Sequence, residues 1–327
     1  MFTDQAGKGT DLEIQLKCSG GLGAQLLAIC YSNKIHEITK RKVVIRFTEM
    51  GNSYRTFMVG DFCTDIDFVI SRNSRNLTPK ENKSDFVLSE FKKSTNKVRN
   101  YLKTTIKRFG IFLFDFLRIR IYSPYLSLEK LKRIKWWSMS VDGYHADMRV
   151  IKDSWPYLRE LVKDSKAKNF IEEAGTLNCL SVHWRLGDYL TTSANQTHGI
   201  VDALSLYRVI ESVSTHHSVD EIKIFTDSPT VASQMISHFT FTVKAEVISS
   251  DIWSDLVAMS KSRFFIGSHS SISIFAALAI LDKNPHNYVY FPEEWFKQLP
   301  EGFKMQGQNY HPNSVLLETL TYQTNFQ

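Results

Sequence analysis

One short string holds the densest set of reactive side chains in this sequence. It runs from Ser181 to Tyr189 (SVHWRLGDY) and has the pattern of a strand that leads into a loop. His183 and Arg185 lie two residues apart, so they share one face of that strand. A planar guanidinium can bind two phosphate oxygens at once, which makes Arg185 a candidate for a diphosphate. The structural alternative is an ion pair between Arg185 and Asp188, with His183 as a core residue.

A second string places four hydroxyl groups between a strand and an apolar helix. It covers residues 267–273 (GSHSSIS). Ser270, Ser271 and Ser273 would lie at the start of that helix, where free N–H groups and the helix dipole favour an anion. Simple capping of the helix needs only one serine. The additional hydroxyls therefore favour a phosphate site.

Asp227 and a glycine loop complete this set. Asp227 ends a predicted strand and would accept hydrogen bonds from a nucleobase or ribose in the same crevice; the equal alternative is an N-cap for the helix that Pro229 opens. In the loop Gly20-Gly21-Leu22-Gly23, Gly21 and Gly23 allow a close approach of the backbone to a ligand. The loop is neither GxGxxG nor a Walker loop, so nicotinamide cofactors and ATP have little support.

Metal chemistry has weaker support. Asp65 and Asp67 form an Asp-x-Asp pair that could hold Mn²⁺ or Mg²⁺, but a solvated turn is the favoured interpretation. The four cysteines form no CxxC, and the ten histidines form no HExxH. We expect no metal site and no cofactor.

Alternating strands and helices must position these strings. The chain opens with a strand, a glycine loop, a helix and a strand, at residues 13–17, 20–23, 25–40 and 43–47. Beyond residue 179 we predict strands at 180–184, 221–226, 243–248 and 263–266, and helices at 203–213, 230–238, 252–261 and 272–281. This alternation predicts an α/β fold with parallel sheets. We expect two Rossmann-like domains, residues 1–155 and 156–327.

The positive charge is concentrated in one segment. The 327-residue chain has a net charge of +6, and residues 80–135 hold 15 Lys and Arg against five Asp and Glu. Three interpretations of this helical segment stay open: a solvated face, contact with anionic lipid or a lipid-linked acceptor, and nucleic acid, which ranks last. No signal peptide or membrane span is predicted. We expect a cytoplasmic protein. A further expectation is peripheral contact of this protein with the inner face of the membrane.

Six strings, in order, resemble the α-1,2-fucosyltransferases, glycosyltransferase family 11. They are GGLGAQL at 20–26, DGYHAD at 142–147, VHWRLGDY at 182–189, IFTDS at 224–228, DLVAMS at 255–260 with 267–277, and YFPEEWF at 290–296. The resemblance implies a GT-B fold, in which two Rossmann-like domains face a central cleft. It also implies an inverting, metal-independent transfer of L-fucose from GDP-fucose to a glycan hydroxyl in surface polysaccharide (O-antigen or capsule) synthesis.

The resemblance also assigns roles. Arg185 would bind the diphosphate and stabilise the leaving group, His183 and Asp227 would contact guanine, and the serines would line the phosphate side. The Gly21–Gly23 loop would close the cleft from the acceptor domain. Asp188 is a candidate general base that, in the alternative, only orients Arg185.

The sequence departs from the family at four places. Ala24, Ser228 and His269 stand where the family has Asn, Asp and Asn, and Ile274-Phe275 replaces a Trp pair. We expect the aromatic and amide changes near the sugar or acceptor, so GDP-colitose or another GDP-deoxyhexose is an alternative donor. Two rival functions are a metal-dependent transferase built on the Asp-x-Asp pair and a binding module that has lost its chemistry.

Overall fold

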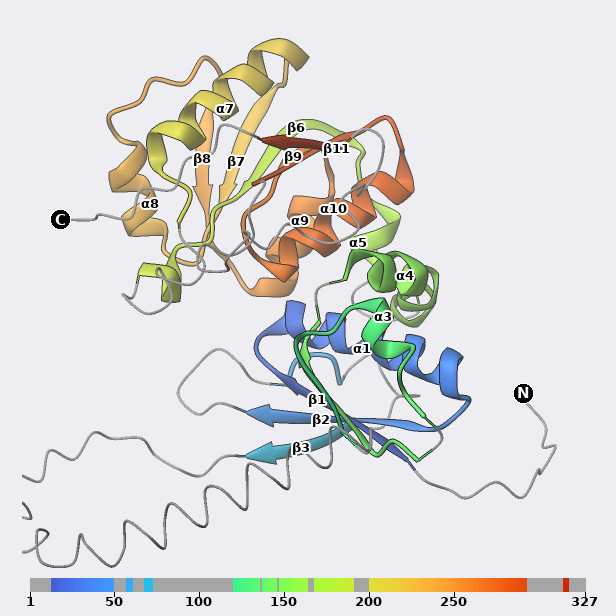
Figure 1. The fold of residues 1–327 in the computed structure, drawn as a ribbon. Coiled ribbons are helices and arrows are strands. Elements are labelled where there is room, and N and C mark those ends of the chain that lie inside the picture. Colours follow the sequence, from blue (N-terminus) through green and yellow to red (C-terminus); the bar gives the residue numbers. More distant parts are fainter. Residues whose placement is uncertain are drawn as a thin grey trace, which may run out of the picture.

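The chain forms two sheets in which every strand pairing is parallel. The computed structural model describes residues 13–49, 57–60, 68–72, 120–135, 137–145, 147–163, 168–190, 200–292 and 314–317. Helices lie against both sheets (Figure 1). The predicted α/β fold with two parallel sheets is therefore confirmed.

The first sheet has the strand order β3-β2-β1-β5-β4. Its strands are β1 (Ile14–Ser19), β2 (Val43–Glu49), β3 (Phe68–Arg72), β4 (Arg120–Tyr125) and β5 (Ser140–Tyr144), and its helices are α1 (Leu22–Thr39), α3 (Leu128–Leu131) and α4 (Met148–Val162). In β1, Ile14, Leu16 and Cys18 are buried and the residues between them are more exposed. This period of two turns one face of the strand toward the core.

The second sheet has the order β11-β10-β9-β6-β7-β8. Its strands are β6 (Leu177–His183), β7 (Glu221–Phe225), β8 (Ala245–Ile248), β9 (Ser262–Ile266), β10 (Tyr288–Pro292) and β11 (Ser314–Leu317). Its helices are α5 (Asn169–Glu172), α7 (Ala203–His217), α8 (Pro229–Ile236), α9 (Ile252–Ser260) and α10 (Ser271–Lys283), with a 3-10 turn at Gly187–Leu190. β6 is buried on both faces from Cys179 to His183, as is typical of a central parallel strand.

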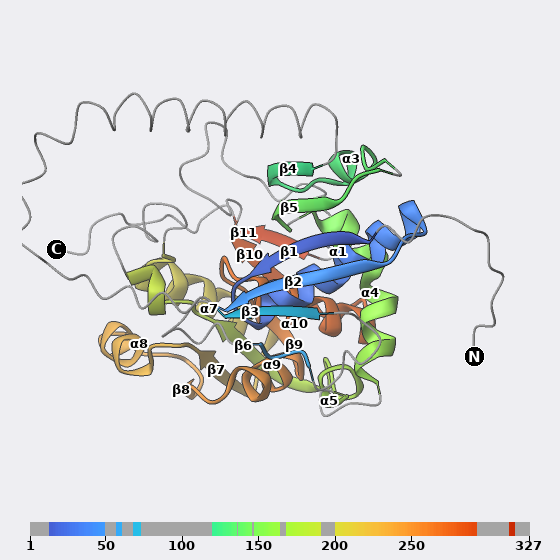
Figure 2. The same cartoon turned by 90° about the horizontal axis from the view of Figure 1, so that it is seen from below.

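The two sheets are joined through helices that share one hydrophobic core. Buried residues of α1 and α4 belong to the same cluster as buried residues of α9 and α10. Figures 1 and 2 show these helices between the two sheets. The expected boundary between residues 155 and 156 lies inside α4, which packs on α1 and joins α10 through an ion pair between Arg159 and Asp282 (3.0 Å).

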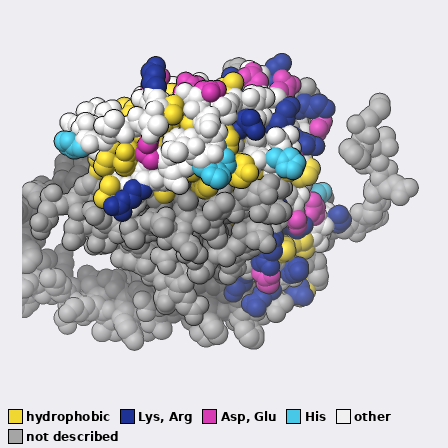
Figure 3. Space-filling view, turned by 90° about the horizontal axis from the view of Figure 1, so that it is seen from above, with side chains coloured by type: hydrophobic (Ala, Val, Ile, Leu, Met, Phe, Trp, Pro, Cys, Tyr) yellow, Lys and Arg dark blue, Asp and Glu magenta, His cyan; other side chains and the backbone are white. Residues whose placement is uncertain are grey.

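Positive and negative side chains are interspersed on the face that Figure 3 shows, so the net positive charge is not concentrated there. Among the described residues, no helix combines the length and apolar character needed to cross a bilayer.

Candidate functional site

The strand order of the second sheet reverses between β6 and β9. From β6 the chain continues to β7 and β8 on one side, whereas β9, β10 and β11 lie on the other. The helices that follow β6 and β9 therefore diverge, and ligands of open α/β sheets bind at such a switch point, beyond the carboxyl ends of the strands. Here β6 ends at His183 and β9 ends at Ile266. Both predicted strings begin at this edge.

Arg185 lies between two carboxylates just beyond β6. Its Nη2 is 2.7 Å from Oδ1 of Asp188, and its Nη1 is 2.7 Å from Oδ2 of Asp227. Burial by itself lowers the pKa of Arg185, but the charges of Asp227 and Asp188 outweigh it and raise that pKa above its ordinary value. The guanidinium thus stays charged. The ion pair with Asp188, named above as the structural alternative, is present. Asp188 accepts a hydrogen bond from Nη2 and Asp227 forms an ion pair with Nη1, so the guanidinium, with its five N–H groups, keeps donors that could bind a ligand.

Asp227 holds the turn that carries Arg185. Its Oδ1 accepts hydrogen bonds from the backbone N–H groups of Leu186 (3.0 Å) and Gly187 (2.8 Å). A Cβ at residue 187 would collide with this carboxylate, which explains the glycine of the GDY string. The N-cap alternative for Asp227 is wrong, because α8 begins after Ser228 and has no side-chain cap. Contact of Asp227 with a nucleobase stays a prediction.

His183 is linked to the serine string through Ser273. Nδ1 of His183 is 2.7 Å from the Ser273 hydroxyl, which also accepts the N–H of Ser268 (3.1 Å). Burial, with the nearby charge of Arg185, lowers the pKa of His183 to about 3. Ser273 is fully buried. We predicted that Ser273 lines the phosphate side. Its hydroxyl instead contacts Nδ1 of His183 and accepts the N–H of Ser268 in the loop before α10.

The start of α10 has unused hydrogen-bonding capacity. Its N-cap, Ser270, forms no side-chain cap bond, and no acidic residue occurs in its first turn. The simple-capping alternative is therefore not observed. The Oγ of Ser268 is buried and has no partner among the described residues. The Tyr189 hydroxyl donates to the His269 carbonyl (2.7 Å), and the Tyr189 ring lies 5.7 Å from the guanidinium carbon of Arg185. Tyr189 thus connects Arg185 with the helix start. The half-buried Ser270 and Ser271 remain predicted ligand contacts.

The glycine loop meets the start of α10 directly. A Cβ at Gly23 would overlap the Ser271 side chain and lie 2.7 Å from the backbone nitrogen of Ile272. Gly23 is therefore explained by packing of α1 on α10. At Gly21 nothing lies within 4 Å of an added Cβ, so this position is open. Neither helix start has a side-chain cap or an acidic first turn.

Gln25 is a motif residue whose role the sequence did not reveal. Its side chain is fully buried, accepts the N–H of Met58 (2.8 Å) and donates to the Gly20 carbonyl (3.3 Å). The Met58 carbonyl in turn accepts from the indole of Trp253 in α9 (3.4 Å). Gln25 thus fastens the glycine loop to a segment that contacts the second half of the chain. The signal available in the sequence was a polar glutamine two residues after the glycine loop, within an otherwise apolar segment.

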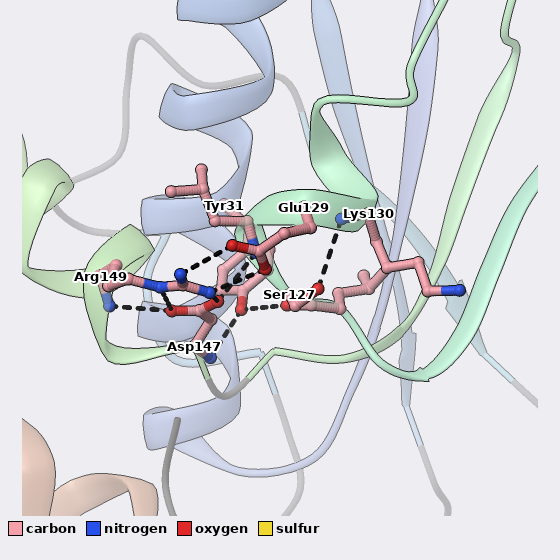
Figure 4. Close-up of polar contacts among 8 residues, drawn as sticks. Tyr31, Ser127, Glu129, Lys130, Asp147 and Arg149 are labelled. Atoms are coloured by element: carbon pink, nitrogen blue, oxygen red, sulfur yellow. Dashed lines mark hydrogen bonds and ion pairs between the residues drawn. The ribbon is translucent and has the colours of Figure 1, made fainter. Parts of the chain in front are cut away.

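The DGYHAD string builds structure in the first half. Asp147 caps α4, and its carboxylate binds Arg149, which also pairs with Glu129 (Figure 4). The Tyr31 hydroxyl accepts the N–H of Asp147 (2.8 Å) and donates to the Leu126 carbonyl (2.5 Å). These bonds tie α1, α3 and α4 together.

Several sequence-based expectations concern residues that lie outside the described ranges or in the core. Asp65 and Asp67 lie outside the described residues, and within the described ranges no three His, Cys, Asp or Glu side chains form a metal-binding group. Residues 80–119 of the basic segment also lie outside the described ranges. Ile274 and Phe275, which we expected near the sugar or acceptor, are both buried in the core, and their position relative to the sugar stays a prediction.

Comparison with known proteins gives fold-level similarities. The sequence matches no protein-family profile and no curated protein. Similar solved structures include POFUT1 in complex with GDP (10% identity, TM-score 0.37, 87% of this chain and 99% of that chain). Others are NodZ α-1,6-fucosyltransferase co-crystallised with GDP (13%, 0.40, 83% and 93%) and a glycosyl transferase family 9 protein from Veillonella parvula DSM 2008 (8%, 0.41, 93% and 85%). Identities and TM-scores this low assign no activity, so the function is argued from the site.

Proposed function

We propose that the crevice between β6 and β9 binds a nucleoside diphosphate sugar and that the protein is a glycosyltransferase. The observation that carries this proposal is Arg185, fixed by Asp188 and Asp227 beside the uncapped start of α10. The guanidinium and the free N–H groups of the helix both favour phosphate oxygens. The unpartnered hydroxyl of Ser268 adds a donor at the same place.

The same groups supply the chemistry of transfer. As the sugar leaves, negative charge gathers on the β-phosphate, and a fixed cation with helix N–H groups stabilises that charge in the transition state. We propose that these groups stabilise the leaving diphosphate without a divalent metal, as the sequence resemblance implies. The 2.7 Å ion pair of Asp188 with Arg185 favours an orienting role for Asp188 over that of general base.

The finer proposal follows the sequence resemblance. We propose GDP-L-fucose as the donor and an inverting transfer that forms an α-1,2 linkage in surface polysaccharide. Six strings in family order support this. Another GDP-deoxyhexose such as GDP-colitose, or a silent binding module, is the alternative.

We further propose peripheral contact with anionic membrane, which would bring a cytoplasmic enzyme to a lipid-linked glycan acceptor. In the described end of the basic segment, Lys132, Arg133 and Lys135 are exposed, and Trp137 and Met139 expose 40% and 48% of their surface. Cations beside exposed apolar side chains suit an anionic bilayer surface. We expect the protein to float with phosphatidylglycerol vesicles at low salt and to lose this binding at high salt. Equal binding to neutral vesicles would contradict the proposal.

A thermal-shift screen tests the main proposal. GDP, UDP, CMP and ADP are each added with and without EDTA, since a ligand of the native state raises the melting temperature. We expect stabilisation by GDP that EDTA does not change, followed by turnover of GDP-fucose. GDP binding without turnover of any GDP-sugar supports the silent module. A shift with UDP and metal alone favours the Asp-x-Asp transferase, and no shift with any nucleotide overturns the proposal.

A further inference from the structure

The contact between His183 and Ser273 determines which group the histidine presents. The Ser273 hydroxyl already accepts the Ser268 N–H, and it has a single hydrogen to donate. Because Ser273 is fully buried, that hydrogen needs an acceptor inside the protein. Among the described hydrogen bonds, Nδ1 of His183, at 2.7 Å, is the acceptor. Nδ1 therefore accepts, and the proton of the neutral ring sits on Nε2.

The surroundings keep the ring neutral. Arg185 is the charged group that acts on His183, and its guanidinium is held in place by Asp188 and Asp227. Burial and this positive charge both oppose a second proton on the ring. With Nδ1 bonded to Ser273 and the proton on Nε2, the neutral ring presents a hydrogen-bond donor and not a base to a ligand at Nε2.

His183 stands at the edge of the proposed ligand site. His183 is the last residue of β6, at the switch point, and 7% of its surface is exposed. Its Nε2 makes no hydrogen bond to the described residues. Nε2 of His183 is not among the fully buried atoms that lack a partner, so water can reach it, and a ligand group that cannot accept its hydrogen would displace that water without replacing the hydrogen bond.

We infer that Ser273 is a positioning residue: it fixes His183 as an Nε2–H donor, and this makes the expected contact of His183 with the base favour a keto oxygen, as at O6 of guanine, over the amino group that adenine carries at the same ring position. The inference rests on the proposed function and adds its base specificity. Guanine O6 and uracil O4 accept hydrogen bonds, whereas the amino groups of adenine and cytosine donate. Without Ser273 the ring could present either nitrogen, and the selection would weaken.

Nitrogen-15 NMR of histidine-labelled protein tests the positioning step without any ligand. In the wild type we expect His183 as a single tautomer with the proton on Nε2. In Ser273→Ala we expect a mixture of tautomers. A wild-type proton on Nδ1 overturns the inference. Because the wild-type spectrum decides this, the test holds even if the variant folds poorly.

Nucleotide affinities test the selection step. The ratio of ADP to GDP dissociation constants is measured for wild type, Ser273→Ala and the control Ser181→Ala. Ser181 is also fully buried, lies two residues before His183 in β6 and bonds to Ser262, away from the site. We expect the ratio to fall roughly 2- to 10-fold in Ser273→Ala, the scale of one neutral hydrogen bond, and to stay unchanged in the control.

The outcomes separate the two proposals. A folded Ser273→Ala protein with the wild-type ratio, or an equal fall in both variants, overturns the selection by His183. If Ser273→Thr, which keeps the hydroxyl, restores the ratio, the role of that group is supported. If the wild type binds no nucleotide, the proposed function and the selection fail together, while the NMR spectrum still decides whether Ser273 positions His183.

Discussion

Both sheets have a switch point, but the described polar groups at the two are used differently. In the first sheet the chain proceeds from β1 to β2 and β3 on one side, with β5 and β4 on the other, so the switch lies between β1 and β5. In the second sheet it lies between β6 and β9. Both are places where the strand order reverses, but β4 lies outside β5 in the first sheet, whereas the chain continues outward from β9 to β10 and β11 in the second. The glycine loop follows β1, and the DGYHAD string begins in β5. The polar side chains at the two switch points have different roles.

At the first switch point, polar groups are used to build the structure. Asp142 pairs with Lys17 (3.0 Å), and Asp147 binds Arg149 and caps α4. His145 stacks on Tyr31 with ring centroids 4.8 Å apart. Although Nε2 of His145 is buried without a partner among the described residues, burial lowers the pKa of His145 to about 4, which leaves a neutral core histidine.

At the second switch point, donors are in surplus. Arg185 retains N–H groups, Ser268 retains a hydroxyl, His183 retains Nε2 and the start of α10 is uncapped. Unsatisfied buried groups cost free energy that a ligand can recover. A switch point offers a place for a ligand, and the balance of satisfied and unsatisfied groups indicates whether one binds there.

The largest expected effect is on catalysis at the second edge. Arg185→Ala should lower the rate of sugar transfer by about a hundredfold to a thousandfold, the scale for losing a fixed group that stabilises developing charge. The control is Arg159→Ala, because Arg159 is half-exposed and pairs with Asp282 far from the site. Steady-state kinetics with GDP-fucose provide the measurement. An Arg185→Ala enzyme within threefold of wild type would show that Arg185 does not bind the diphosphate.

The next effect is on stability at the first edge. Asp147→Ala removes a helix cap and leaves the N–H groups of Leu128 and Arg149 without their acceptor. The free energy of unfolding in urea should fall by about 2–3 kcal/mol. Glu129→Ala, which removes the exposed partner of Arg149, should cost under about 1 kcal/mol. Equal losses in the two variants, or a weaker GDP affinity in folded Asp147→Ala, would contradict the contrast between the edges.

The smallest effect concerns the junction between the two edges. Gly23→Ala forces a methyl group against the backbone of α10, and the free energy of unfolding should fall by about 1–2 kcal/mol. Gly21→Ala, where an added Cβ has open space, should change it by less than about 0.5 kcal/mol. Thermal denaturation without ligand measures both. If Gly21→Ala proves the more costly variant, the proposed packing of α1 on α10 is wrong.

Sequence periodicity predicted the second half well. Helix α7 begins at Ala203 as expected, and β7, α9, β9 and α10 lie within two residues of their predicted limits. These elements alternate regularly and bury apolar faces, so local pattern and tertiary structure agree. Helix α4 was not predicted. Its buried residues Met148, Ile151, Trp155, Leu158 and Val162 do recur at helical spacing, but Pro156 in the middle of the segment is typical of a helix break.

The sequence by itself determined that this is an α/β protein with strand-end strings rich in phosphate-binding side chains. Those properties follow from period, composition and spacing along the chain. Only the tertiary structure decided which members of the strings are free to act. In the folded chain Asp227 accepts hydrogen bonds from the turn after β6, and the buried Ser273 contacts Nδ1 of His183. Gly23 packs directly against the start of α10. Those pairings join residues distant in sequence, and hydrogen-bond satisfaction depends on such neighbours, which no local pattern records.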